Sequence, residues 1–132
     1  MKIVTNPSVS EVKKLFSVND DSNNFRYFVN RDFSCIQNHL VTILFYEDEE
    51  PVSYGHLDLE NNDTWLGIYV SPKYRKRGYG KMMMGVLMSH VNKKVKLSVD
   101  KTNTNAMKLY EYFLFKIIGE NEKSLYMEYN NV

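Results

Sequence analysis

The sequence contains one cysteine, no long apolar run and no apolar leader at its start. With Cys35 alone, the chain cannot form an internal disulfide or a metal site built from several cysteines. Its apolar stretches stay well short of the ~20 residues that a membrane helix needs. The first ten residues lack the apolar core of a signal peptide. We therefore expect a cytoplasmic protein with no membrane partner.

The chain also has almost no net charge. Its 17 Lys and Arg residues face 16 Asp and Glu residues, which leaves a net charge of +1. Such a balance creates no overall electrostatic field that attracts nucleic acid, so we expect no nucleic-acid partner. A local basic patch is still compatible with it. The 132 residues are 43% hydrophobic and 14% aromatic. That length and composition fit one globular domain over residues 1–132.

Apolar periodicity predicts alternating helices and strands. Helices are expected after Ser8 or Ser10, where Val12, Leu15 and Phe16 follow helical spacing, and over residues 79–91 and 103–113. A polar loop at 20–24 leads to a second helix or helical turns within 25–36. Strands are expected over residues 40–46, 52–60, 64–70, 95–99, 115–118 and 125–129. The sum is one sheet with helices packed on its faces, in the α/β or α+β class.

Two neighbouring strands carry the informative patterns. The strand 52–60 alternates, and its polar face holds Tyr54, His56, Asp58 and Glu60. A turn at 61–63 follows, and the strand 64–70 is almost wholly apolar, which predicts a central position covered on both faces. Pro72 ends that strand because proline cannot donate to a ladder.

Residues 66–81 run from the apolar strand through a basic, glycine-spaced turn into the start of a helix. The first turn of a helix has unpaired N–H groups and a partial positive charge, which together bind phosphate. Gly78 and Gly80 let the backbone approach a diphosphate closely. A cationic rim surrounds them, formed by Lys73, Arg75, Lys76, Arg77 and Lys81.

Two common phosphate motifs do not fit this turn. A dinucleotide-binding G-x-G-x-x-G needs a third glycine where Met83 stands. A nucleotide P-loop needs glycine in place of Arg75, and Ser or Thr in place of Met82. The remaining pattern, Arg-x-x-Gly-x-Gly between a strand and a helix, resembles the signature of the GNAT acetyltransferase superfamily. In that family the amides of this loop hold the pyrophosphate of acetyl-CoA.

A second segment resembles the same family. Residues 99–111 are similar to its V-x3-N-x2-A-x2-LYE segment; the family commonly continues with Gly-Phe, whereas this chain has Leu114-Phe115. The resemblance covers residues 41–127 and implies a mixed, mostly antiparallel sheet flanked by helices on both faces. It implies acetyl-CoA as co-substrate, bound by Ile68, Tyr69, Val70, Arg75, Lys76, Arg77, Gly78, Tyr79, Gly80, Lys81, Asn103 and Tyr110.

The resemblance also implies direct transfer of an acetyl group to a primary amine, without a metal. A main-chain N–H within residues 68–70 would stabilise the developing oxyanion. Tyr110 is the candidate general acid for the thiolate, although its place on a helix stripe equally fits a core tyrosine. Family members often have a glutamate base where Thr64 stands. Here the candidates are His56, then Asp58, then Glu60, unless they are plain solvent-facing strand residues and a water chain serves instead.

Position alone assigns acceptor recognition to residues 24–38. The candidate acceptor-binding residues are Phe25, Arg26, Tyr27, Phe28, Asn30 and Arg31. The same residues fit a structural role equally well, with the aromatic rings packed in the core and the arginines in solvent. His39 and His90 are assigned to packing or to the surface. The acceptor is a small amine, an amino sugar or a protein amine, and a homodimer stays open. Two rivals remain, namely a catalytically silent acyl-CoA-binding sensor or scaffold domain, and a nucleic-acid-binding module that uses the basic turn.

Overall fold

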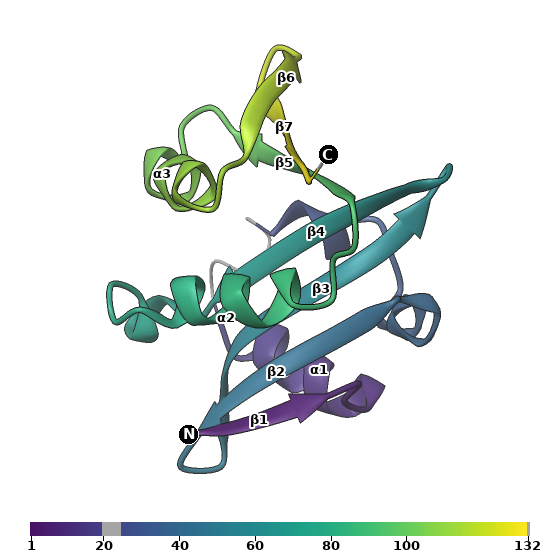
Figure 1. Cartoon of the computed structure of the whole chain (residues 1–132). Helices are drawn as coiled ribbons and strands as arrows, with labels where there is room; N and C mark the ends of the chain where they lie inside the picture. The colour runs from purple at the N-terminus through teal and green to yellow at the C-terminus, as the bar shows by residue number, and fades with distance from the viewer. Residues whose placement is uncertain (20–24, 132) are drawn as a thin grey trace.

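Seven strands form one sheet in the described part of the chain, residues 1–19 and 25–131 of a computed structural model (Figure 1). The loop expected at 20–24 lies outside these ranges. The order is β1-β2-β3-β4-β5-β7-β6, and every pair is antiparallel except β4 with β5. The mixed, mostly antiparallel sheet is therefore confirmed. Its strands are β1 (Lys2–Thr5), β2 (Val41–Glu47), β3 (Glu50–Glu60), β4 (Asp63–Val70), β5 (Lys94–Asp100), β6 (Lys116–Glu120) and β7 (Ser124–Asn130).

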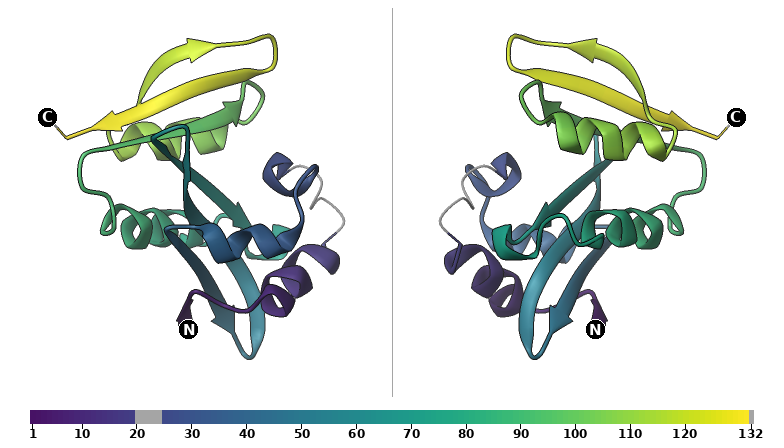
Figure 2. Two further views of the ribbon diagram at one scale, coloured as in Figure 1. Left: turned by 90° about the vertical axis from the view of Figure 1, so that its right-hand side faces the viewer. Right: turned by 90° about the vertical axis from the view of Figure 1, so that its left-hand side faces the viewer.

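Helices cover both faces of this sheet, as expected (Figure 2). On one face lie α1 (Val9–Ser17) and the 3-10 turns η2 (Arg26–Phe28) and η3 (Phe33–Asn38). On the other lie α2 (Tyr79–Met88) and α3 (Thr104–Tyr112), whose apolar side chains join those of β2, β3, β4, β5 and β7 in the larger core. In the part of the chain that the structure describes, no helix is long and apolar enough to cross a membrane.

The start of α1 shows how local sequence sets an element. Ser8 is the N-cap: its Oγ accepts the Glu11 N–H at 3.2 Å, and its own N–H donates to Glu11 Oε1 at 3.0 Å. This reciprocal pair satisfies two N–H groups that a helix end leaves unpaired. The predicted apolar positions Val12, Leu15 and Phe16 are all buried. Of the two serines considered for the cap, Ser8 is confirmed.

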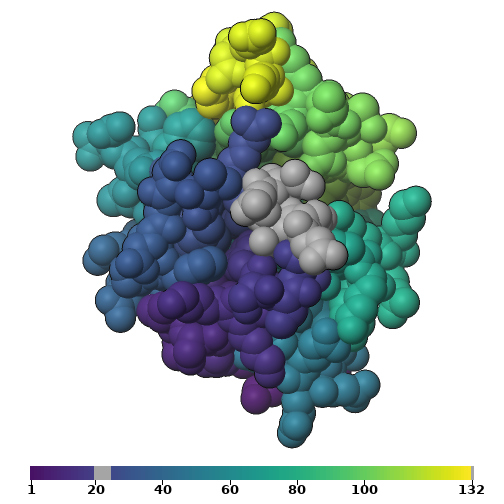
Figure 3. Space-filling model, turned by 180° about the vertical axis from the view of Figure 1, so that it is seen from behind, coloured from purple at the N-terminus to yellow at the C-terminus, as the bar shows by residue number. Residues whose placement is uncertain are grey.

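The β3–β4 hairpin places the polar row of β3 inside the protein. Its turn residues Asn61 and Asn62 have φ of 52° and 69°, the left-handed pair that suits a tight hairpin. The predicted alternation is confirmed. The solvent-facing alternative is wrong for two of the three base candidates, His56 and Asp58, which are only 2% and 9% exposed, whereas Glu60 is exposed. Tyr54 in the same row is fully buried. Figure 3 shows this side of the molecule, where α1 and the segment after residue 24 lie over the sheet.

Candidate active site

The sheet is open between β4 and β5. β3 pairs with β4 along the whole of β4, whereas β5 meets β4 at one position among the described residues, Trp65 opposite Lys96. Beyond that position the two parallel strands diverge toward Val70. The divergence leaves one edge of the second half of β4 without a strand partner, although β4 has the central place in the sheet that the sequence predicts.

Backbone groups of β4 face this gap. The Ser71 N–H donates to the Val52 carbonyl of β3 at 2.9 Å. Because N–H groups alternate along an antiparallel strand, those of Val70 and Ile68 point the other way, toward β5. Arg75 fits this direction, since its Nε donates to the Val70 carbonyl at 2.9 Å. Ile68 and Val70 therefore offer amides to the gap.

Tyr69 lies between those two residues and faces differently. Its N–H points toward β3 by the same alternation. Its ring is 5% exposed and packs against Phe16, with the ring centroids 4.8 Å apart. Of the three β4 residues that the family resemblance implicates, Tyr69 thus contributes to the core beneath α1 and presents no amide to the gap.

The turn after β4 presents a row of unpaired amides. The 3-10 turn η4 (Pro72–Tyr74) is followed by Lys76 and Gly78 with φ of 63° and 90°, and Gly78 is the N-cap of α2. None of the N–H groups of residues 76–81 donates to another described residue. A Cβ built at Gly78 meets no atom within 4 Å, so space is open above the row. A diphosphate fits such a cradle of exposed amides at a helix N-terminus.

The cationic rim around the cradle is smaller than predicted. Lys73 lies 3.0 Å from Glu50, which neutralises it, and Arg75 is engaged by the Val70 carbonyl. The remaining three cations pair with no described carboxylate: Lys76, Arg77 and Lys81. Of these, Lys81 lies 4.0 Å from the centre of the Tyr112 ring, so it joins the start of α2 to the end of α3.

Helix α3 lies beside the cradle and carries Tyr110. The Tyr110 side chain is 7% exposed, and burial raises its pKa to about 12. Its hydroxyl has no hydrogen-bond partner among the described residues, yet no fully buried side-chain oxygen there lacks one, so this hydroxyl reaches the surface. A buried tyrosine normally finds a partner for its hydroxyl. Tyr110 is therefore a core ring with a donor available to a ligand.

The other family-implied positions have local structural contacts. Asn103 is the N-cap of α3, where its Oδ1 accepts the Ala106 N–H at 3.2 Å. Tyr79 and Gly80 form the first turn of α2, with Gly80 against Leu109 of α3. Leu114, where the family commonly has glycine, has a φ of 71°. The left-handed turn after α3 is thus kept at an exposed leucine despite its Cβ, at a cost of about 1–2 kcal/mol.

His56 lies over β4 from the η2 side. Its Nδ1 is 2.6 Å from the Tyr54 hydroxyl, and burial holds the pKa of its imidazole well below the usual range. Its Cε1 and Nε2 lie directly above the backbone of Gly67. Nε2 has no described partner, so by the argument used for Tyr110 it accounts for part of the small exposure of the ring. The ring is neutral at neutral pH and can accept a proton there.

Gly67 gives His56 this position, which leads to a stability prediction. A Cβ at residue 67 would lie 2.7 Å from both Cε1 and Nε2 of His56 and 3.1 Å from Phe25 Cζ. We expect Gly67→Ala to lower the free energy of unfolding by about 1–3 kcal/mol, because the imidazole must leave its place. Urea unfolding measures this. Gly119→Ala, where a Cβ meets nothing within 4 Å, is the control; equal stability of both variants would contradict the contact.

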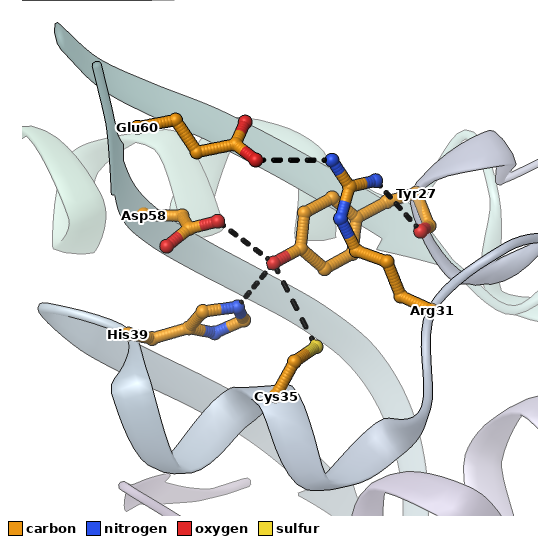
Figure 4. A network of polar contacts seen from close by, with 6 residues as sticks. All are labelled: Tyr27, Arg31, Cys35, His39, Asp58 and Glu60. Atoms are coloured by element: carbon orange, nitrogen blue, oxygen red, sulfur yellow. Dashed lines mark hydrogen bonds and ion pairs between the residues drawn. The ribbon is translucent and has the colours of Figure 1, made fainter.

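A network of polar side chains lies next to His56 and was missed by sequence reasoning (Figure 4). The Tyr27 hydroxyl donates to Asp58 Oδ2 at 2.9 Å, lies 2.6 Å from His39 Nε2 and accepts from Cys35 Sγ at 3.8 Å. Arg31 covers the Tyr27 ring at 4.1 Å. His39, assigned to packing or to the surface, is in fact part of this network. Tyr27, Arg31, Cys35 and His39 recur at every fourth residue, but Asp58 lies 31 residues beyond Tyr27, so their spacing does not indicate the contact with it.

Comparison with known proteins identifies the family of this chain. The Acetyltransferase (GNAT) family model matches residues 10–114. The chain is 32% identical over 69 residues to a spermine/spermidine N(1)-acetyltransferase of Bacillus subtilis, an alignment covering 48% of this chain. The chain spans only 45% of that relative's length.

Two solved structures share the fold. A PaiA N-acetyltransferase of Thermoplasma acidophilum, in complex with coenzyme A, has a TM-score of 0.72, with 16% identity and coverage of 98% of this chain and 99% of that one. A ribosomal-protein-alanine N-acetyltransferase of Brucella melitensis has a TM-score of 0.75, with 12% identity and coverage of 98% and 99%. The protein belongs to the GNAT family of acetyltransferases.

Proposed function

We propose that the protein is an acetyl-CoA-dependent N-acetyltransferase that transfers the acetyl group directly to a primary amine. The observation that carries this proposal is the row of unpaired N–H groups at residues 76–81, beside the gap between β4 and β5. The N–H groups of this row can donate to the diphosphate. The gap can hold the extended pantetheine arm, whose amides need backbone hydrogen-bond partners. The coenzyme A complex of the PaiA neighbour supports the same ligand.

The residues around the gap have distinct tasks in this reaction. Acetyl-CoA supplies a thioester-activated acetyl group. The amides of Ile68 and Val70 face the gap and donate to the acetyl carbonyl oxygen as negative charge develops on it. The Tyr110 hydroxyl gives a proton to the departing sulfur. A phenol that remains protonated and unpartnered is suited to this donation.

His56 is the proposed base for the acceptor amine. It is neutral at neutral pH, and its edge lies over Gly67, next to the Ile68 amide. For Nε2 to accept the amine proton, Nδ1 must hold the ring proton and donate it to the Tyr54 oxygen, which lies 2.6 Å away. Asp58 lies one row farther along β3, opposite Trp65, and is therefore farther from the Ile68 amide.

The acceptor is a primary aliphatic amine carried by a small molecule or a protein. The names of the B. subtilis and B. melitensis relatives concern polyamines and a ribosomal protein alanine. Release of thiol from acetyl-CoA, measured over a panel of amines, tests the proposal. We expect turnover with at least one primary amine and none with tertiary amines. Binding of acetyl-CoA without thiol release from any amine would indicate the catalytically silent domain instead.

The pH dependence of the reaction follows from the two buried groups. The general acid must be protonated, and with a pKa of about 12 Tyr110 remains so up to strongly alkaline pH. The base must be neutral, and the lowered pKa of His56 keeps it so throughout the neutral range. We therefore expect kcat/KM to rise between about pH 7 and 10 as the amine deprotonates, with no descending limb. A descending limb centred near pH 8–9 in a protein that stays folded would contradict this.

A further inference from the structure

Asp58 is a nearly buried carboxylate, and one of its oxygens has no hydrogen-bond or ion-pair partner among the described residues. Its side chain is 9% exposed, and Oδ2 accepts the Tyr27 hydroxyl at 2.9 Å. Oδ1 has no described partner, yet no fully buried side-chain oxygen in the described residues lacks one. Oδ1 therefore reaches solvent. A buried carboxylate without full hydrogen bonding is costly unless something compensates it.

Three carboxylates on β3, β4 and β5 each pair with a cation, whereas no described cation pairs with Asp58. Each of these carboxylates lies 3.1–3.3 Å from a basic side chain: Glu60 from Arg31, Asp63 from Lys96, and Asp100 from Arg26. Among the described residues no Lys, Arg or His forms an ion pair with Asp58. Of these four carboxylates, Asp58 is thus the one that no described cation neutralises.

The titratable groups that face Asp58 cannot supply the missing positive charge. A carboxylate only accepts hydrogen bonds, so the Tyr27 O–H donates to Asp58. The Tyr27 oxygen then accepts a hydrogen bond from His39 Nε2–H, 2.6 Å away. The Thr42 hydroxyl then donates to His39 Nδ1 at 2.9 Å, so the imidazole is neutral, in line with a pKa that burial lowers. Burial raises the pKa of Cys35, which stays a neutral thiol.

We propose that Asp58 receives a second, non-reacting ammonium group of the acceptor, so that the preferred substrates are aliphatic diamines or polyamines. This rests on the proposed N-acetyltransferase function. His56, the proposed base, precedes Asp58 by two residues on the same face of β3, a separation of about 7 Å. Two amines separated by four methylenes lie about 6 Å apart. Trp65, the cross-strand partner of Asp58, leaves the sheet on the same face and provides an apolar wall.

The test compares 1,4-diaminobutane with butylamine as acceptors, at one pH and saturating acetyl-CoA. We expect the wild type to prefer the diamine by about tenfold or more in kcat/KM, because a hydrogen bond to a charged group is worth at least that factor. Asp58→Asn should bring the ratio close to one, because the diamine loses far more of its kcat/KM than butylamine does. Asp58→Glu, which retains the charge, should keep a preference. Asp63→Asn removes a carboxylate that Lys96 already neutralises and should also keep it.

Two further measurements separate the outcomes. Should Asp58→Asn fail to fold, the wild-type rates with 1,4-diaminobutane and with uncharged 4-aminobutanol decide, since only the diamine should gain. Should the wild type acetylate no amine of the panel, the proposed function fails, and calorimetry of 1,4-diaminobutane binding to the wild type and to Asp58→Asn still tests the Asp58 site. Acetylation of other amines but not of 1,4-diaminobutane overturns the inference and leaves the proposed function standing. Equal use of diamine and monoamine by the wild type, or an unchanged preference in a folded Asp58→Asn protein, overturns the inference.

Discussion

Gly78→Val is expected to weaken acetyl-CoA binding by about 100-fold or more, which is the largest effect on affinity that the structure predicts. The new side chain would enter the open space above the amides of residues 76–81, where the diphosphate would lie. Residue 78 also has a φ of 90°, which a β-branched side chain does not adopt without strain. Losing two or three charge-assisted hydrogen bonds is sufficient for a change of this size. Isothermal titration calorimetry with acetyl-CoA measures it.

The matched control for this variant lies in the same helix. Gly85 is in the middle of α2, and a Cβ there meets nothing within 4 Å. Gly85→Ala should leave acetyl-CoA affinity unchanged and raise the free energy of unfolding by about 1 kcal/mol, since alanine favours a helix over glycine. If Gly78→Val binds acetyl-CoA as tightly as Gly85→Ala does, the ligand does not contact this turn.

Tyr110→Phe is expected to lower kcat by about 100-fold or more, with little change in the affinity for acetyl-CoA. The substitution removes the one hydroxyl that the reaction would use and keeps the ring that packs against Phe115. General acid catalysis contributes an effect of this size. Because the hydroxyl has no described protein partner, its loss should cost little stability. Thiol release and calorimetry together measure both quantities.

Tyr112→Phe on the same helix is the control for that experiment. Tyr112 is 62% exposed and keeps its ring contact with Lys81 as phenylalanine. It should have wild-type kcat. Equal turnover of Tyr110→Phe and Tyr112→Phe would assign Tyr110 to the core alone, as its place on the apolar stripe of α3 first suggested.

The parts of this site that are continuous in sequence could be predicted from it. The apolar strand, the glycine-spaced turn and the following helix adjoin one another, and α2 begins at Tyr79 as expected. Its end differs, because the apolar spacing continues to residue 91 while the helix stops at Met88. The spacing of Val12, Leu15 and Phe16 likewise identified the buried side of α1. In each case short-range chemistry decides the local structure.

Features that depend on contacts distant in sequence could not be predicted. β1 was missed because its four residues form an edge strand whose pattern is mostly exposed. The burial of His56 and Asp58 depends on η2 and η3, which lie about 20–30 residues earlier in the chain. The role of Tyr27 depends on Asp58 and His39, and only the folded sheet brings these three together.

The central claim is that backbone amides of the β4–α2 turn and of the open edge of β4 bind acetyl-CoA. Titration of the 15N-labelled protein with acetyl-CoA, followed by amide chemical shifts, tests it most directly. The account predicts that the largest shifts occur at residues 76–81, with further shifts at Ile68 and Val70, whose amides face the gap. Shifts confined to other surfaces, or no shifts at millimolar acetyl-CoA, would contradict it.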